Sequence, residues 1–332
     1  MDRILLGHGS GGELTHKLLK DVFFSQWKDL LPDDMGDATP LSAPARIAVT
    51  TDTFTAKPLF FPGGDIGKLA ITGTVNDLAV STAKHLYITV GFVIEAGFPT
   101  ADLMRIVKSM GDTARRLGIK IVAGDTKVVE SGKADGVYIN TTGIGQLEGL
   151  GVLEKDPIRP GDRVIVSGPI GDHAAAMLVA RGELGLKADI ISDCAPVSGI
   201  VKTALKVGGV KWMRDPTRGG VATTLNELVM ERRGFGIRLI EEDIPIRKEV
   251  RGIGELLGID PLYMACEGRV LMVVAEDRAE DVLRAIRNLP EGEAAAIIGE
   301  VTSDHPGRVR LKTKWAERFV PMLPGEMLPR IC

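Results

Sequence analysis

The chain divides near its middle at the stretch Leu153-Glu154-Lys155-Asp156-Pro157-Ile158-Arg159-Pro160-Gly161-Asp162. This stretch is polar and contains proline and glycine, a composition typical of a boundary between domains. On each side of it, short runs of β-branched residues alternate with segments whose apolar residues recur at helical spacing. The sequence therefore predicts a mixed α/β (α+β) protein with two domains.

Each half combines expected strands with expected helices. In the first half, the pattern predicts strands at 46–52, 86–95, 119–123 and 138–144 and helices at 65–83 and 101–117. In the second half, it predicts strands at 163–167, 236–240, 269–275 and 296–301 and helices at 172–181, 197–207, 220–233 and 277–289. The proline-rich end, 319–332, is expected to be an extended, mobile tail because proline blocks helix and central strand. We therefore expect domains at 1–155 and 156–318, followed by a flexible tail at 319–332.

Bulk composition excludes several classes of protein. The chain has 332 residues, of which 44% are hydrophobic and 26% charged, and its formal net charge is -3. This balance is typical of a globular protein and gives no electrostatic footprint for nucleic acid or an anionic membrane. No run of 18 apolar residues is present, and the apolar run after Arg3 is too short for a secretory signal. We expect a cytoplasmic protein with neither nucleic acid nor a membrane as its partner.

Two glycine-rich stretches resemble phosphate-binding loops without matching them fully. Gly7-His8-Gly9-Ser10-Gly11-Gly12 has the spacing of a dinucleotide-binding loop, but no second strand ends in an acid about 20 residues further on. A flexible anion-binding lid suits this loop better, and a plain linker remains open. Gly63-Gly64-Asp65-Ile66-Gly67-Lys68 fails the P-loop pattern because Pro62 and Leu69 replace its first glycine and its Ser/Thr. Any ATP site must therefore be of another type.

Four aspartates stand at expected strand ends and turns: Asp52, Asp77, Asp125 and Asp215. Carboxylates in such places hold Mg²⁺ and phosphate groups, because hard oxygen ligands suit that ion. Each aspartate taken alone is better explained as a turn residue or a helix cap. Only their joint occurrence indicates a metal site.

The last residue, Cys332, is one of only three cysteines, the others being Cys194 and Cys266. The three lie far apart in sequence and form neither a disulfide framework nor a zinc-ligand pattern. A free terminal thiol on an extended tail is a liability unless it is used. Prenylation is excluded because it requires a cysteine further from the end. Cys332 is therefore expected to be reactive.

These motifs together resemble the HypE family of hydrogenase maturation proteins, the carbamoyl dehydratases. That family lies within the superfamily of aminoimidazole ribonucleotide synthetase and selenophosphate synthetase. The resemblance covers nearly the whole chain, and the closing Pro-Arg-Ile-Cys is its most specific element. It is carried by the motifs Gly7–Gly12, Thr51–Thr53, Gly63–Gly67, Asn76–Ala79, Gly124–Val129, Asp215–Gly220, Cys266–Gly268 and Pro329–Cys332.

The resemblance implies a PurM-like architecture, in which the mixed sheet of the N-terminal domain forms a homodimer interface. It further implies that ATP and Mg²⁺ bind between the two domains. A carbamoyltransferase would load the thiol of Cys332, and ATP-dependent dehydration would convert the resulting thiocarboxamide to a thiocyanate. An iron-carrying maturation complex would accept the cyanide for the NiFe site of a hydrogenase.

The resemblance also assigns residues to roles. Cys332 would be the carrier, Glu267 the base and Lys127 the group that stabilises the transferring charge, although a surface or turn carboxylate remains an alternative for Glu267. The metal would be held by Asp52, Asp77, Asp125 and Asp215. The implied nucleotide contacts are Asp52, Asp65, Lys68, Asn76, Asp77, Asp125, Gly9 and Gly11.

Three rival functions remain open. A selenophosphate synthetase generally has Cys or selenocysteine in its N-terminal glycine loop, and Gly7–Gly12 contains neither. Another ATP-dependent, phosphoryl-activating enzyme of the superfamily has no need of a terminal cysteine. The chain could alternatively be a thiol carrier without catalysis. The four aspartates and Lys127 speak against that, and an ATPase assay would separate the two.

Overall fold

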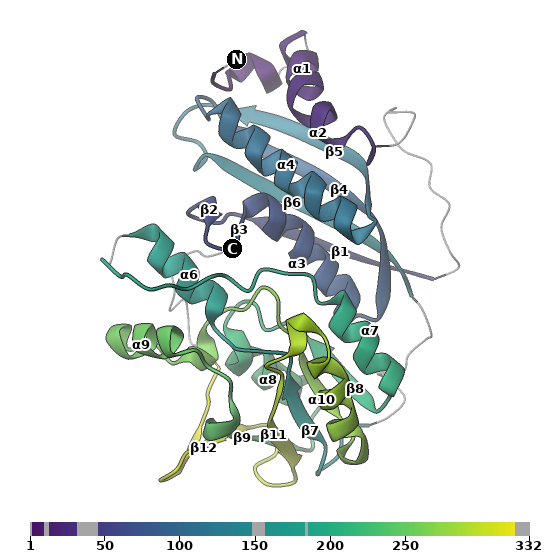
Figure 1. Cartoon of the computed structure of the whole chain (residues 1–332), viewed down its shortest axis with the longest axis vertical. Coiled ribbons are helices and arrows are strands. Elements are labelled where there is room, and N and C mark those ends of the chain that lie inside the picture. The colour runs from purple at the N-terminus through teal and green to yellow at the C-terminus, as the bar shows by residue number, and fades with distance from the viewer. Residues whose placement is uncertain (1, 10–12, 32–45, 148–156, 183–184, 323–332) are drawn as a thin grey trace.

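The computed structural model describes residues 2–9, 13–31, 46–147, 157–182 and 185–322, and the statements below concern these residues. They form a four-stranded sheet in the N-terminal half and a seven-stranded sheet in the C-terminal half, with helices packed on both (Figure 1). A short two-stranded hairpin, β2 (Phe60–Phe61) and β3 (Gly64–Asp65), leads into the first long helix. This arrangement confirms the expected mixed α/β class.

The N-terminal sheet has the order β1-β6-β4-β5. Its strands are β1 (Ile47–Phe54), β6 (Val137–Leu147), β4 (Ala83–Glu95) and β5 (Lys120–Val129), and only the β4–β5 pair is parallel. Two helices, α3 (Ile66–Val80) and α4 (Thr100–Leu117), cover one face of this sheet (Figure 1). Near the N-terminus lie the short turns and helices η1 (Leu6–Gly9), α1 (Glu13–Leu18), η2 (Leu19–Phe24) and α2 (Ser25–Trp27).

The opposite face of the N-terminal sheet carries exposed side chains. Ile47 is 45% exposed, Val49 60% and Val93 37%. Because side chains alternate across a strand, these residues lie on the face away from α3 and α4. The sheet therefore presents a partly apolar surface that no described helix covers.

The C-terminal sheet has the order β13-β12-β9-β11-β7-β10-β8. Its strands are β7 (Arg163–Val166), β8 (Val210–Arg214), β9 (Gly236–Ile240), β10 (Leu271–Val274), β11 (Ala296–Thr302), β12 (Val309–Lys312) and β13 (Glu317–Phe319). Its helices are α6 (Asp172–Arg181), α7 (Ser198–Val207), α8 (Gly220–Glu231), α9 (Lys248–Leu257) and α10 (Ala279–Arg287). No helix in the described part of the chain has the length and hydropathy that a bilayer crossing requires.

The two halves share their hydrophobic cores. Ala79 and Val80, at the end of α3, pack in a cluster with residues of α7 and α10. Conversely, residues of α6 and Cys194 pack in the main core of the N-terminal half. Helix α3 is buried along most of its length, which explains why it consists mainly of apolar and small residues. Helix α3 therefore packs against both halves of the molecule.

Most expected elements are confirmed, with ends that differ by a few residues. Sequence patterns did not predict β8, α9, β12 or β13. One expectation is corrected: Phe319 belongs to β13, and Val320 is only 1% exposed, so these two residues are part of the C-terminal sheet region and not of a mobile tail. The backbone N–H of Val320 donates to Val309 O at 2.9 Å, which fixes this end of the chain.

Candidate functional site

Four acidic residues from four separate segments converge where α3 meets the C-terminal half. We call Asp52, Asp77, Asp215 and Glu267 the acid cluster. Asp52 lies on β1 and Asp77 near the end of α3, whereas Asp215 directly follows β8 and Glu267 precedes β10. Asp215 is 8% exposed and Glu267 only 3%. Such burial of carboxylates is unusual unless they are paired or hold a cation.

Burial and the charges of neighbouring cluster members raise the pKa values of Asp52, Asp215 and Glu267. Burial, followed by the negative charge of Asp77, raises the pKa of Asp52 to about 6, while Arg218 acts in the opposite direction. Burial and then Asp77 raise the pKa of Asp215 to about 7. Burial and then Asp215 raise the pKa of Glu267 well above its ordinary value. The four carboxylates therefore lie close enough to repel one another through a poorly hydrated region.

A cavity of about 370 Å³ opens beside the cluster. Asp77 and Asp215 line it together with Thr50, Trp212 and Arg214. Burial raises the pKa of Asp77, and the Thr50 hydroxyl opposes this by donating to Asp77 Oδ2 at 2.7 Å. The cavity thus combines carboxylates, a cation and an aromatic ring, as small-molecule sites commonly do.

The acid cluster fits a divalent cation that is only partly coordinated by protein. Among the residues the structure describes, no three His, Cys, Asp or Glu side chains are arranged to enclose a metal ion by themselves. Mg²⁺ is commonly held by one or two carboxylates, with water and phosphate oxygens completing its coordination. Mutually repelling carboxylates beside an open cavity match that pattern, because a cation would offset their repulsion.

Asp125 and Lys127 do not join the cluster within one chain. Asp52 pairs with Thr141, which is fully buried under α3, whereas Asp125 pairs with Gly91 one residue further along the sheet register. A shift of one residue places a side chain on the other face of a sheet. Asp125 and Lys127 accordingly lie exposed on the open face, where the Lys127 ammonium is 3.1 Å from the Asp125 carboxylate.

Asp65 and Lys68 lie at the other end of α3. Asp65 caps this helix by accepting from the backbone N–H groups of Gly67 and Lys68 at 2.7 and 3.0 Å, and Lys68 Nζ donates to Gly63 O. Asp77 lies twelve positions after Asp65 along the helix, about 18 Å at the helical rise. The cofactor-binding residues expected from the sequence therefore form two separate groups.

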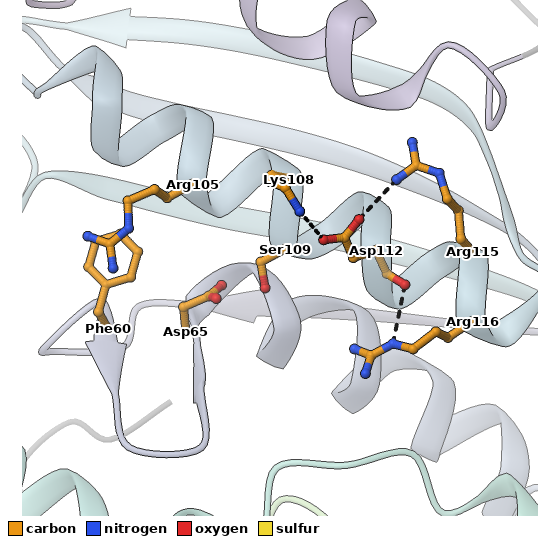
Figure 2. Close-up of a pocket in the computed structure, with 8 residues that line it drawn as sticks. All are labelled: Phe60, Asp65, Arg105, Lys108, Ser109, Asp112, Arg115 and Arg116. Atoms are coloured by element: carbon orange, nitrogen blue, oxygen red, sulfur yellow. Dashed lines mark hydrogen bonds and ion pairs between the residues drawn. The ribbon is translucent and has the colours of Figure 1, made fainter.

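Asp65 borders a second cavity, of about 690 Å³, on the surface of α4. Figure 2 shows Asp65 and Ser109 facing it between basic side chains of α4. Most of these cations have partners: Arg105 lies over the Phe60 ring at 3.9 Å, and Lys108 and Arg115 form ion pairs with Asp112 (Figure 2). The charges of the side chains that line this cavity are thus largely balanced by their partners. The cavity is separate from the acid cluster.

Three expected site residues are described only in part or not at all. Gly9 ends the 3-10 turn η1, so the first part of the glycine loop is ordered backbone. Gly11 and Cys332 lie outside the described residues.

Asn76, expected to contact a nucleotide, is 1% exposed, and its amide is bonded to backbone groups of the C-terminal half.

Sequence reasoning missed Arg218 and Asp193. The positive charge of Arg218 lowers the pKa of Asp52. Its place in the Asp-Pro-Thr-Arg motif could have identified it as a site residue. Asp193 accepts from the backbone N–H of Glu267 at 3.0 Å, and its side chain is fully buried. It lies in an irregular segment without a periodic pattern, so nothing in the sequence pointed to it.

Comparison with known proteins agrees with this architecture. The N-terminal domain of AIR synthase related proteins matches residues 35–147, and their C-terminal domain matches residues 159–312. The fold and the site between its halves thus define a two-domain protein of the AIR synthase related class.

Individual relatives narrow the class further. The carbamoyl dehydratase HypE of Azotobacter vinelandii is 46% identical over 331 residues, which cover 98% of this chain and 96% of the relative. A crystal structure of HypE in complex with ATP has a TM-score of 0.90 and 41% identity, covering 99% of this chain and all of the other. HypE from a HypE–HypF complex has a TM-score of 0.79 and 44% identity, covering 94% of this chain and 100% of the other. The chain belongs to the HypE family.

Proposed function

We propose that this protein catalyses the ATP-dependent dehydration of a thiocarboxamide on Cys332 to a thiocyanate. The thiocyanate supplies the cyanide ligand for the iron of a NiFe hydrogenase. Membership of the HypE family supports this function. The observation that carries it is the acid cluster, whose buried carboxylates meet beside a cavity at the junction of the two halves.

ATP and Mg²⁺ are the cofactors that suit this junction. A related HypE has been crystallised with ATP. Asp77 and Asp215 line the cavity, and Asp52 is electrostatically coupled to both. One or two of these carboxylates would hold the metal, with water and phosphate oxygens completing its coordination. When bound, Mg²⁺ would neutralise the phosphates and orient the γ-phosphoryl group.

The reaction needs a leaving group and a base. An amide oxygen leaves poorly, so its phosphorylation by ATP converts it to phosphate, which departs as the carbon–nitrogen triple bond forms. Two protons must leave the nitrogen in the course of the reaction, and Glu267 would accept one of them. Burial and the neighbouring acids raise the pKa of Glu267, which makes its carboxylate a stronger proton acceptor.

The described part of the chain ends, at Pro321 and Met322, close to Glu267. The Tyr263 hydroxyl donates to Pro321 O at 2.8 Å, and Tyr263 is four residues before Glu267, at most roughly 14 Å along an extended chain. The ten residues 323–332 span at most roughly 36 Å. The thiol of Cys332 can therefore return to the acid cluster or extend outward to a partner enzyme.

Three partners follow from this proposal. A carbamoyltransferase loads Cys332, in keeping with the solved complex of a related HypE with HypF. An iron-carrying maturation complex accepts the cyanide in the cytoplasm. A second copy of the chain covers the open sheet face, where Ile47, Val49 and Val93 are exposed. Asp125 and Lys127 lie on this face, so they would act on the reaction only across such a dimer.

Intact mass measurement tests the function directly. The purified protein is incubated with its carbamoyltransferase, carbamoyl phosphate and ATP, and the peptide ending at Cys332 is followed over time. We expect a gain of one carbamoyl group and then the loss of one water. A carbamoyl adduct that persists in the presence of ATP would show a carrier without dehydratase activity.

A further inference from the structure

The amide of Asn76 ties helix α3 to two segments of the C-terminal half. Its Nδ2 donates to Glu267 O at 3.2 Å and to Ala195 O at 3.1 Å, and its Oδ1 accepts from the backbone N–H of Val197 at 2.9 Å. Two carbonyl oxygens on one side and an N–H on the other fix which amide atom is nitrogen. Asn76 therefore has little remaining capacity to bind a nucleotide.

Asp193 binds the backbone of Glu267 at its N–H group, on the other side of that residue. Asp193 Oδ1 accepts from the backbone N–H of Glu267 at 3.0 Å, and Asp193 Oδ2 faces Arg269 Nε at 3.4 Å. At the next position, a Cβ on Gly268 would lie 1.9 Å from Asp193 O, so only glycine fits there. The N–H and the C=O of Glu267 are thus both held, the N–H by a carboxylate and the C=O by the Asn76 amide together with the backbone N–H of Ala195 at 3.4 Å.

We propose that Asn76 and Asp193 are positioning residues, which fix the backbone of Glu267 and so direct its carboxylate into the acid cluster. The inference rests on the proposed function, in which Glu267 accepts a proton. It gives Asn76 a role other than the nucleotide contact expected from the family resemblance. Asn76 belongs to α3 and is followed by Asp77, so the same helix that presents a metal-binding carboxylate also sets the position of the base.

Small displacements of a base have large effects on rate. A misplacement of about 1 Å lowers catalytic rates by as much as about 100-fold. The effect of losing Asn76 should therefore appear in the rate constant for dehydration at saturating ATP and should leave the affinity for ATP nearly unchanged. A nucleotide ligand would show the reverse pattern.

The test uses Asn76→Asp in the full-length protein, carbamoylated at Cys332 by its transferase. This variant keeps the shape and the acceptor for Val197, but turns an oxygen toward two carbonyl oxygens. We expect dehydration at saturating ATP to slow by at least about tenfold, with the Kd for ATP within about twofold of the parent. In the double variant with Glu267→Gln, we expect a rate within about twofold of Glu267→Gln alone, because residues that act as a unit are not additive.

Asn226→Asp is the matched control. Asn226 is also buried, and its Nδ2 also donates to two carbonyl oxygens, those of Ala222 and Val320. We expect it to lower the melting temperature about as much as Asn76→Asp. Any effect of Asn226→Asp on the dehydration rate should be the same factor with and without Glu267→Gln.

Three results would overturn the inference. They are equal slowing by Asn76→Asp in the parent and in Glu267→Gln, weakened ATP binding with an unchanged maximal rate, or a parental rate for Glu267→Gln itself. A parent protein that never loses water from its carbamoylated tail would instead refute the proposed function. If Asn76→Asp does not fold, Asp193→Asn and Asp193→Ala give the second test. We expect Asn, which keeps an acceptor for the Glu267 N–H, to recover part of the rate lost with Ala, and equal rates would contradict the proposal.

Discussion

At the scale of single residues, both described cysteines are too deeply buried to be reactive thiols. Cys194 is 2% exposed and Cys266 is fully buried. Burial raises the pKa of Cys194 to about 12 and that of Cys266 well above its ordinary value. The thiolate is the reactive form, so both are protonated and inert at pH 8. This leaves Cys332 as the candidate nucleophile.

Thiol labelling checks this separation. In the native protein at pH 8, we expect a maleimide to modify one cysteine, Cys332, and in denaturant all three. Peptide mass mapping identifies the modified position, and Cys332→Ala serves as the control with no native label. Rapid native labelling of Cys194 would contradict the burial described above.

Asp77 allows a second residue-scale prediction. Asp77→Asn keeps the shape of the side chain but removes a charge from the proposed metal site. We expect the affinity for Mg²⁺–ATP to fall at least about tenfold, or about 1.4 kcal/mol. Calorimetric titration measures this, with Asp102→Asn on the exposed side of α4 as the control. Unchanged affinity and ATP hydrolysis would remove Asp77 from the site.

At the scale of elements, the close contact between α3 and α4 depends on Gly67. A Cβ at this position would lie 2.4 Å from Ile106 O and 2.9 Å from Met110 Cγ. Helices approach this closely only where one of them has no side chain. The position of α3, and with it that of Asp77, therefore depends on a glycine in its first turn.

We expect Gly67→Ala to destabilise the protein by about 1–3 kcal/mol through overpacking. Gly252 is the matched control: it lies in α9, its φ is not positive, and a Cβ there would meet nothing within 4 Å. Gly252→Ala should stabilise the protein by about 0.4–1 kcal/mol, because alanine restricts the unfolded chain. Denaturant unfolding measures both, and a stable Gly67→Ala variant would show that the helices can separate without loss.

At the scale of the whole molecule, the open face of the N-terminal sheet predicts self-association. Val49 is 60% exposed on this face. Val49→Asp would place an unpaired charge in the interface and should weaken the dimer by at least about 2 kcal/mol, or roughly 30-fold. Met104→Asp, on α4, is the control, since Met104 is 39% exposed away from that face. Sedimentation of the parent as a monomer at micromolar concentration would remove the dimer from the proposal.

The reach of the tail is a second property of the whole molecule. Deleting residues 323–328 shortens the segment between Met322 and Cys332 by roughly 20 Å at full extension. We expect dehydration of the carbamoylated tail to slow strongly, because the thiocarboxamide must reach the γ-phosphate. Replacing the same six residues with a Gly-Ser linker keeps the length and should keep most of the rate. A normal rate in the deletion variant would rule out a tail that swings between partner and cavity.

The sequence by itself determined the mixed α/β class and most helices and strands. It also marked Cys332, Asp52, Asp77 and Asp215 as candidate site residues, and Glu267 was added by the family resemblance. These follow from local signals, since hydrophobic periodicity and motif spacing depend on neighbouring residues alone. Elements such as β8 and β12 escaped prediction because their short runs acquire strand structure from partners that are distant in sequence.

Only the tertiary structure decided which of the expected site residues meet. The register of β1, β6, β4 and β5 places Asp52 and Asp125 on opposite faces of one sheet, a distinction of a single residue that no local pattern records. The length of α3 separates Asp65 from Asp77, and the packing of its end against α7 brings the Asn76 amide to the backbone of Glu267. Contacts between residues 191 positions apart depend on how the two halves dock, because the energy that fixes them arises from burial across their interface.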